Sequence, residues 1–396
     1  MRILIDANPV IHGERAVQRN SRNLIDHLVK RESDIEYILF YYSWRGTRNS
    51  MIAIPTGRGH REFVCRLPGR LLEWSWRHYS WPAIESFVGA VDLVYGPDLV
   101  FPPARRAITM STLHGIVYVA APELTTPGHA EPLRRALDYA MRESDYYLAV
   151  SEQTKRDFMN YLNLPANRIR VSPHGVDPHM HRVEDRELVR SILRERFQLT
   201  KPYLLYVGAL SSNKNILRLV EAFAFISTEF PDLTLVLAGP FENAYDEAVR
   251  SVREKGLENR VRFLGPVSPE GDDIMHLYNG AEVLIHPSLY EGWVAPPLEA
   301  MACGIPVVAS NVSSIPETCG GAALLVDPLN IGSIAQGIRD VLDNLPLRQS
   351  LIERGFRRVK ECQWSDSAAR LEGIFRELIQ SGQHHRRNYE KRTGKF

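Results

Sequence analysis

The segment that decides the fold is PSLYEGWVAPPLEAMACGIPVVAS, residues 287–310. Two carboxylates in it, Glu291 and Glu299, are separated by seven residues that include one glycine and two adjacent prolines. The apolar run before it, residues 282–286, predicts a strand. Proline is tolerated in the first turn of a helix, so we expect a helix from about residue 297 to residue 303. Glu291 then lies in the loop and Glu299 in the first helical turn.

The expected helix start has two chemical interpretations. A helix N-terminus carries partial positive charge and N–H groups without intrahelical partners, which suits a phosphate or diphosphate. Glu299 is favoured there by the helix dipole alone, without any function. Alternatively, Glu299 accepts hydrogen bonds from paired sugar hydroxyls while Glu291 contacts a second sugar, with a diphosphate between them.

Short β-rich runs alternate with helical patterns along the whole chain, which predicts parallel sheets with crossover helices. Two such series indicate two doubly wound units, joined by a charged, partly helical linker at 176–202. Ligands of such sheets bind at the carboxyl ends of the strands. Helical patterns fall, for example, at 17–29 and 132–141. The predicted strands are 2–6, 37–42, 91–95, 107–112, 146–150 and 168–172 in the first series, and 203–207, 234–238, 260–264, 282–286, 307–309 and 323–326 in the second.

Length and composition limit the class of protein. A chain of 396 residues is long enough for two domains. Its 48 basic and 47 acidic residues give a net charge of +1, which argues against a nucleic-acid partner. The four cysteines show no C-x-x-C spacing, as expected for a reduced, cytoplasmic protein. No apolar window approaches a membrane span or a signal peptide, so we expect a soluble protein or one attached to a membrane surface.

The segment 287–310 resembles the Glu-x7-Glu signature of retaining glycosyltransferases of glycosyltransferase family 4. The motifs YVGALSSNKNILRLVEAF, LVLAGP, VRFLGPVS, LYNGAEVLIHPSLYEG and GGAALLVDPLNIGSIAQGI follow in the family's order, and VSEQTKRDF and VSPHGVD match in the first half. The resemblance implies an α/β protein of the GT-B fold, in which two Rossmann-like doubly wound domains face each other across a cleft.

The domains implied by the resemblance are an acceptor domain and a donor domain. The N-terminal acceptor domain would span 1–180 and be completed by a C-terminal helix at 365–382. The donor domain, which binds the nucleotide-sugar, would span 200–362. The remaining residues, 383–396, form a basic tail that we expect to be disordered.

The resemblance also implies roles for individual residues. Glu299 would bind the ribose hydroxyls, Glu291 the donor sugar and Lys214 the diphosphate, while His114 would lie near the reacting anomeric carbon. From sequence alone, a lone histidine at a strand end is more often structural. Gly13 would let the first loop approach the phosphates. Further donor-binding positions are Gly208, Asn213, Gly239, Val267, Gly292, Trp293, Val294 and Ala295.

The sequence departs from the family pattern at several of these positions. Asn213 stands where most relatives have arginine, so one positive charge near the diphosphate is missing. Val294 replaces the second glycine of the motif, and a β-branched residue resists positive φ. The first loop, HGER, has one glycine where relatives often have two, and LHG replaces a His-Asp pair.

The implied reaction is transfer of a sugar, with retained configuration, from a nucleoside diphosphate to a hydroxyl of a glycan or lipid-linked acceptor in cell-surface polysaccharide synthesis. We expect mannose from GDP-mannose first, and a glucose-type sugar from a UDP-sugar otherwise. The sequence contains no Asp-x-Asp motif, so no metal or other cofactor is expected. The alternative is a weakly active or non-catalytic protein that binds a nucleotide-sugar.

A tryptophan-rich stretch, residues 69–82, also has two interpretations. GRLLEWSWRHYSWP combines three tryptophans with two arginines. It fits an amphipathic helix packed on the first domain, which we favour, and the competing interpretation is a patch at the interface of an anionic membrane. The basic tail would support the second interpretation.

Overall fold

The computed structural model describes residues 1–12, 15–44, 51–55, 59–268 and 271–381. The chain forms two compact units. Unit 1 contains residues 1–120, 127–175 and the described residues from Trp364 onward, and unit 2 contains residues 121–126 and 176–363. Helix α16 therefore belongs to unit 1, although it is the last helix described in the chain.

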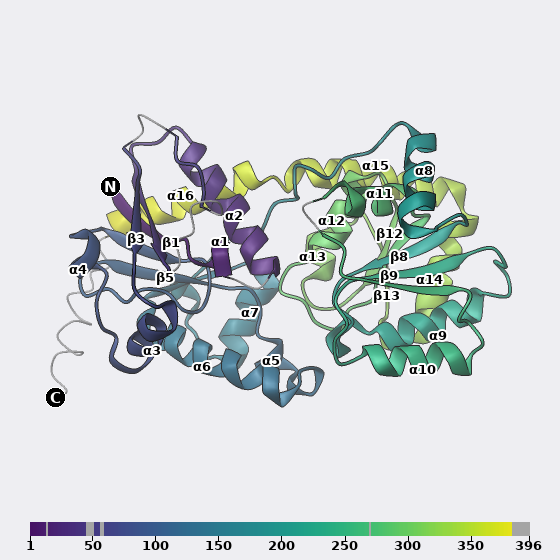
Figure 1. The fold of residues 1–396 in the computed structure, drawn as a ribbon, viewed down its shortest axis with the longest axis horizontal. Helices are drawn as coiled ribbons and strands as arrows, with labels where there is room; N and C mark the ends of the chain where they lie inside the picture. Colours follow the sequence, from purple (N-terminus) through teal and green to yellow (C-terminus); the bar gives the residue numbers. More distant parts are fainter. Residues whose placement is uncertain (13–14, 45–50, 56–58, 269–270, 382–396) are drawn as a thin grey trace. The chain divides into compact units, whose positions relative to one another are not determined.

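Unit 1 is built on a seven-stranded parallel sheet with the order β3-β2-β1-β4-β5-β6-β7 (Figure 1). The strands are β1 Arg2–Asp6, β2 Glu36–Tyr42, β3 Arg61–Cys65, β4 Leu93–Gly96, β5 Ile108–Leu113, β6 Tyr146–Ala149 and β7 Ile169–Val171. The helices are α1 Pro9–His12, α2 Arg15–Lys30, α3 Gly69–Tyr79, α4 Glu85–Val88, α5 Val117–Ala120, α6 Pro127–Glu143, α7 Glu152–Tyr161 and α16 Trp364–Gln380.

Unit 2 is built on a six-stranded parallel sheet with the order β10-β9-β8-β11-β12-β13. The strands are β8 Tyr203–Val207, β9 Thr234–Ala238, β10 Val261–Gly265, β11 Val283–His286, β12 Val307–Ser310 and β13 Leu324–Val326. The helices are α8 Arg186–Phe197, α9 Ile216–Ile226, α10 Tyr245–Glu254, α11 Asp272–Gly280, α12 Ala295–Ala302, α13 Ile315–Cys319, α14 Ile331–Asp343 and α15 Leu345–Glu361.

Both faces of the unit 2 sheet are covered, as parallel sheets require. Successive side chains of a strand point to opposite faces, so Leu204 and Leu205 enter different cores. Leu205 packs in a core with α8, α11 and α12, and Leu204 packs in a core with α9, α10 and α14 (Figure 1). This explains why the strands of the second half are continuous apolar runs in the sequence.

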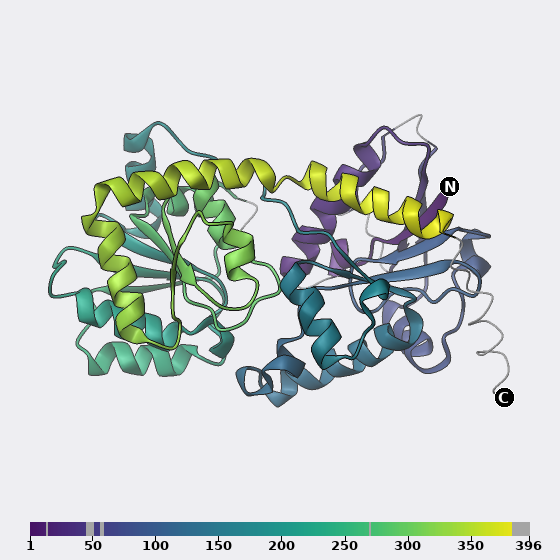
Figure 2. The same ribbon diagram turned by 180° about the vertical axis from the view of Figure 1, so that it is seen from behind.

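Helix α16 completes the core of unit 1 on the face where α2 lies (Figure 2). Its side chains Trp364, Leu371 and Phe375 are buried with strand residues such as Ile3 and Leu39. Glu372 accepts hydrogen bonds from Arg31 and Ser33, which ties the helix to the end of α2. The helix starts at Trp364, one residue before the predicted start at 365.

Every predicted strand occurs in the structure with ends that differ by two residues at most. Strand β3 was missed because Arg61 and Glu62 interrupt its apolar pattern, and the topology explains them: β3 is an edge strand. The linker interpretation of 176–202 is wrong. Val176, Val189 and Leu193 in this segment are buried in a core of unit 2, so α8 is an integral helix of that unit.

Candidate active site at the carboxyl ends of the unit 2 strands

The sequence-predicted donor residues of unit 2 gather at the carboxyl ends of its parallel strands, where ligands of such sheets bind. Gly208 follows β8, Gly239 follows β9, and Val267 lies two residues beyond β10. The loop that carries Glu291 follows β11. The sheet topology therefore brings segments that are far apart in sequence to one edge.

Gly208 and Gly239 are required by the close approach of two backbones. Both have positive φ, 151° and 155°, which lies in a region that glycine adopts readily. A Cβ atom on Gly239 would lie 1.9 Å from the carbonyl oxygen of Gly208. A side chain at Gly239 would force the two strand ends apart and displace the loop that leads to Lys214.

Lys214, Glu291 and His286 form a cluster of three polar side chains. Lys214 Nζ donates a hydrogen bond of 2.5 Å to Glu291 Oε1, and His286 Nε2 lies 3.4 Å from the same oxygen. The Glu291 side chain is 10% exposed and that of His286 is 2% exposed. His286 is the last residue of β11, and its ring stacks on Tyr206 of β8 with 13° between the ring planes.

The cluster holds Glu291 as a carboxylate. Burial alone raises the pKa of Glu291, but the Lys214 cation and the hydrogen bond from His286 outweigh it and lower the pKa to about 2. Burial lowers the pKa of His286 below its ordinary value despite the neighbouring carboxylate. His286 is therefore neutral near pH 7 and supports Glu291 through its Nε2–H group, which also lies 3.1 Å from Ser288 Oγ, while Lys214 supplies the charge.

The backbone of Glu291 is fixed by the loop after β12. Ser313 Oγ accepts from the Glu291 N–H and donates to the Glu291 carbonyl at 2.7 Å, and Ser314 Oγ donates to the same carbonyl at 2.9 Å. Asn213 fixes the neighbouring residues. Its carbonyl accepts from the Leu289 N–H at 2.7 Å, and its side chain accepts from Ser211 Oγ. Asn213 thus ties the Lys214 turn to the Glu291 loop without supplying charge.

The start of α12 differs from the prediction. The helix begins at Ala295, so Pro296 and Pro297 are its second and third residues, as tolerated there. Because prolines have no N–H, only Ala295 among the first three helical residues can donate to a ligand. Val294 precedes the helix with φ of −121°, which confirms that this position avoids the left-handed conformation.

Glu299 lies in the second turn of α12, not in the first turn as predicted, because the helix begins two residues earlier. The side chain is buried, and Tyr278 OH donates to Glu299 Oε2 at 2.7 Å. Favourable interaction with the helix dipole concerns the first turn, so the dipole alone no longer explains an acid here. A buried carboxyl group needs hydrogen-bond partners, and Tyr278 from α11 is one of them.

The remaining predicted positions of unit 2 lie beside this cluster in sequence. Gly292 and Trp293 continue the loop after Glu291, and the Trp293 ring packs against the core formed with α12. The indole N–H of Trp293 is buried and has no hydrogen-bond partner among the described residues. Val267 packs against the same core. Gly13, predicted for the first loop of unit 1, lies outside the described residues.

His114 of unit 1 follows β5 and contacts a second histidine. His114 Nε2 donates to the carbonyl of Pro97 at 2.8 Å, which leaves Nδ1 as an acceptor for His174 Nε2 at 3.3 Å. His174 is buried and packs against the Trp364 ring at the start of α16. Burial, reinforced by His114, holds the pKa of His174 well below its ordinary value. Both ring nitrogens of His114 are thus engaged within unit 1.

Comparisons with known proteins agree with this arrangement. A model described as Glycosyltransferase Family 4 matches residues 17–179, and one described as Glycosyl transferases group 1 matches residues 190–358. The O-antigen chain mannosyltransferase B of Escherichia coli is 30% identical over 295 residues, which are 72% of this chain and 75% of that protein. The chain belongs to glycosyltransferase family 4. It is a glycosyltransferase enzyme.

Two further relatives of this family 4 glycosyltransferase match over a smaller share of their length. The D-inositol 3-phosphate glycosyltransferase of Corynebacterium glutamicum is 28% identical over 62% of this chain and 60% of that protein. The serotype-specific mannosyltransferase WbdA of Escherichia coli is 25% identical over 61% of this chain, but only 30% of that protein is covered.

Solved structures establish the fold of this family 4 glycosyltransferase. Sucrose-phosphate synthase from Thermosynechococcus elongatus matches with a TM-score of 0.71 and 20% identity, over 96% of this chain and 99% of that chain. Anabaena HepE in complex with UDP-glucose matches with a TM-score of 0.67 and 19% identity, over 96% of this chain and 100% of that chain. The prediction of two Rossmann-like α/β domains of the GT-B type is confirmed.

Two side chains near the predicted residues were missed from the sequence. His286 precedes the quoted segment directly, and its position at a strand end was the available signal. His174 lies in VSPHGVD, a motif that supports the family resemblance but whose histidine received no predicted role. Among the described residues, no group of three His, Cys, Asp or Glu side chains could hold a metal ion, and no helix combines the length and apolarity of a membrane span.

Proposed function

We propose that this glycosyltransferase transfers mannose from GDP-mannose, with retained anomeric configuration, to a hydroxyl of a glycan or lipid-linked acceptor in cell-surface polysaccharide synthesis. The observation that carries the proposal is the Lys214–Glu291 pair at the carboxyl edge of the unit 2 sheet. The mannosyltransferase name of the 30% identical relative supports the choice of mannose and of a polysaccharide product. A glucose-type sugar from a UDP-sugar is the second choice.

Lys214 is suited to stabilise the leaving diphosphate, because it is a cation at a site with little exposure, where electrostatic stabilisation of developing charge is strongest. Binding of the donor would give Lys214 a second anionic partner beside Glu291. His286 would then keep Glu291 in place through its N–H group. In this proposal Glu291 faces the donor sugar, and Glu299 binds the ribose hydroxyls.

The retaining step would follow a front-face route. Retaining hydrolases use a carboxylate nucleophile close to the sugar, and the chain has no residue at a corresponding family position. The departing phosphate oxygen would instead take the proton of the acceptor hydroxyl as the new glycosidic bond forms. We propose that the step needs no metal, since the sequence lacks an Asp-x-Asp motif. His114 would contribute from unit 1 near the reacting carbon, after exchanging one of its present hydrogen bonds.

Attachment to an anionic membrane on the cytoplasmic side is part of the proposal. Helix α3 buries Trp76 completely, so part of the tryptophan-rich stretch is a packed helix. On the other face Leu71 and Trp74 are 57% and 50% exposed, and Trp81, which follows the end of the helix, is 59% exposed. Exposed tryptophan beside arginine favours the headgroup region of a membrane. The basic tail that would add to this attraction, residues 383–396, lies outside the described residues.

The test is product formation with a panel of GDP-mannose, UDP-glucose and ADP-glucose, followed by assignment of the anomeric configuration of the product by NMR. Transfer of mannose with retention is the expected result. Inversion, or preference for a UDP-sugar, would contradict the mechanism or the donor. Glu299→Ala should weaken nucleotide affinity by about 1 to 3 kcal/mol, the range for losing a charged hydrogen-bond partner. The exposed Glu258→Ala serves as its control.

The membrane part has a separate test. Trp74→Ala combined with Trp81→Ala should reduce binding to vesicles that contain phosphatidylglycerol, and added salt should reduce it further. Equal binding of the variant and the unchanged protein would contradict an interface on α3. The donor proposal concerns unit 2 and the membrane proposal concerns α3 in unit 1. Product formation measured without vesicles therefore still tests the donor proposal.

A further inference from the structure

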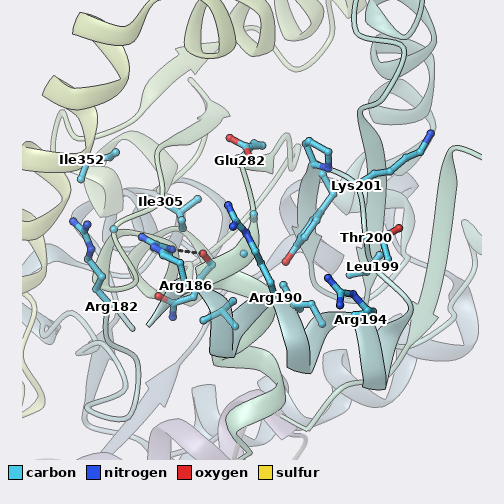
Figure 3. Close-up of a pocket in the computed structure, with 18 of the residues that line it drawn as sticks. Arg182, Arg186, Arg190, Arg194, Leu199, Thr200, Lys201, Glu282, Ile305 and Ile352 are labelled. Atoms are coloured by element: carbon cyan, nitrogen blue, oxygen red, sulfur yellow. Dashed lines mark hydrogen bonds between the residues drawn. The ribbon is translucent and has the colours of Figure 1, made fainter. Parts of the chain in front are cut away.

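Unit 2 contains a second concave site at the opposite edge of its sheet from Glu291. A cavity of about 590 Å³ lies at the amino ends of β8, β11 and β12, where Tyr203, Glu282 and Ile305 line it. Helix α8 borders it (Figure 3). Its volume is in the range of ligand sites. A strand of five residues spans about 16 Å, so a small ligand there cannot reach the residues at the carboxyl ends.

Basic side chains dominate the lining of this cavity. Glu282 is the one carboxylate among the lining residues, all of which the structure describes. Three further carboxylates pair with lining residues from outside the cavity. When they are counted too, basic groups still exceed carboxylates by two. These three are Glu184, Glu187 and Asp232. The basic lining residues are Arg182, Arg186, Arg190, Arg194, Lys201 and Arg348.

Three of these arginines form a stripe on α8. Arg186, Arg190 and Arg194 follow at four-residue spacing and therefore lie on one face, where like charges repel each other. Arg186 donates to the backbone carbonyl of Asn279 at 2.7 Å, the dashed line in Figure 3, and it forms no ion pair with a carboxylate in the part of the chain that the structure describes. The Arg194 side chain makes no hydrogen bond or ion pair with any residue that the structure describes. An anion bound at this helix face would therefore reduce the repulsion between its positive charges.

The ion pair that Arg190 of the stripe forms is easily exchanged for a ligand. Arg190 pairs with Glu187 on the same helix, and the two side chains are 69% and 81% exposed. Ion pairs with that much exposure contribute little to stability, so Arg190 can turn to a ligand at small cost. In Figure 3 the ammonium group of Lys201 extends away from Glu282, which leaves the arginines as the ligand-facing cations.

We propose that this cavity binds an anion that carries two or more phosphate groups. The planar guanidinium group matches phosphate oxygens with two parallel hydrogen bonds. Arg186 and Arg194 are separated by about 12 Å along the helix with Arg190 between them, so a chain of phosphate groups can engage more of the stripe than one phosphate can. The phosphates can come from a soluble polyphosphorylated compound or from adjacent headgroups of an anionic lipid surface.

The test compares two neutralised positions with a matched position on the same helix. R190Q/R194Q removes two charges from exposed positions and keeps Arg186, whose hydrogen bond to Asn279 joins α8 to α11. R196Q is the control: Arg196 is also on α8, but it pairs with Asp273 and does not line the cavity. Thermal unfolding of each full-length variant checks that it folds.

Inorganic tripolyphosphate, titrated calorimetrically, is the soluble probe. We expect R190Q/R194Q to bind it at least about tenfold more weakly than the unchanged protein, and R196Q to bind it with unchanged affinity. Lys214→Ala marks the proposed donor site and should keep the binding at the cavity. The proposal is overturned if Lys214→Ala loses tripolyphosphate binding while R190Q/R194Q keeps it. The phosphates would then bind at the other edge of the sheet.

Vesicles of phosphatidylcholine, with or without phosphatidylglycerol, distinguish the lipid source. Binding to the anionic vesicles that falls in R190Q/R194Q and not in R196Q supports lipid headgroups, and an effect on tripolyphosphate alone supports a soluble ligand. If R190Q/R194Q changes neither binding, the cavity is not an anion site. None of these readouts requires glycosyl transfer, so a failure here is distinguishable from a failure of the proposed function.

Discussion

Each unit places a histidine at or just after the end of a parallel strand, but the two surroundings differ in charge. In unit 2, His286 lies beside a carboxylate that Lys214 neutralises. In unit 1, His114 bonds to a carbonyl and to the neutral His174. A paired charge can exchange partners when an anion binds, whereas hydrogen bonds to a carbonyl and to a neutral imidazole offer only polar contacts. The difference fits the proposal that unit 2 binds the charged donor and that unit 1 contacts hydroxyl groups.

The largest expected effect concerns the cation of unit 2. Lys214→Ala should lower the rate of sugar transfer by roughly a hundred- to a thousandfold, the loss typical of one well-placed electrostatic group. Turnover with saturating donor measures it. Lys255→Ala, an exposed lysine of the same unit, should leave turnover unchanged. Near-normal turnover of Lys214→Ala would mean that another part of the chain holds the diphosphate.

The second effect concerns acid stability. The pKa of Glu291 is lowered to about 2, so its ionised form stabilises the fold above the ordinary value of 4.5. This contribution, about 3 kcal/mol, should be lost as the pH falls from about 4.5 towards 2. Urea unfolding over that range should show a smaller decline for Glu291→Gln than for the unchanged protein. Parallel curves for both proteins would show that Glu291 is not held as a carboxylate.

A smaller effect separates the two supports of Glu291. His286→Phe keeps a ring next to Tyr206 but removes the N–H group, which should cost about 1 to 2 kcal/mol of unfolding free energy at pH 7. The acid transition attributed to Glu291 should also move to higher pH, because one group that lowers its pKa is gone. His286→Gln, which retains an N–H donor, should recover part of both effects. Equal losses in the two variants would indicate a packing role alone.

The smallest effect tests the histidine pair of unit 1. The pKa of His174 is lowered in the fold, so below about pH 6.5 the unfolded chain takes up a proton that the folded chain does not. The free energy of unfolding therefore decreases as the pH falls below 6.5. His174→Phe should flatten the slope of unfolding free energy between about pH 7 and 5.5 by roughly 1 kcal/mol per pH unit. The exposed His129→Phe should leave the slope unchanged. An unaltered slope in His174→Phe would mean that the fold does not lower the pKa of His174.

The sequence predicted the strands more reliably than the helix boundaries. Strands β8 and β9 were predicted to the residue because buried parallel strands are unbroken apolar runs. The helix at Glu299 was placed two residues late, since proline is compatible with several positions of a first turn. The segment with α8 looked like a linker because only a few of its side chains, among them Val189 and Leu193, are apolar enough to show its packing.

By itself, the sequence determined the family and the two-sheet α/β architecture, because spacing and order of motifs are properties of the chain. It also predicted Lys214, Glu291 and Glu299 as site residues, and their roles stay predictions. Only the tertiary structure decided which atoms meet. His286 lies beside Glu291 because β11 ends there, and His174 bonds to His114 although 60 positions separate them. The arginines of α8 line a cavity with the amino ends of three strands. Such contacts depend on strand order and helix packing, and no local pattern in the sequence encodes them.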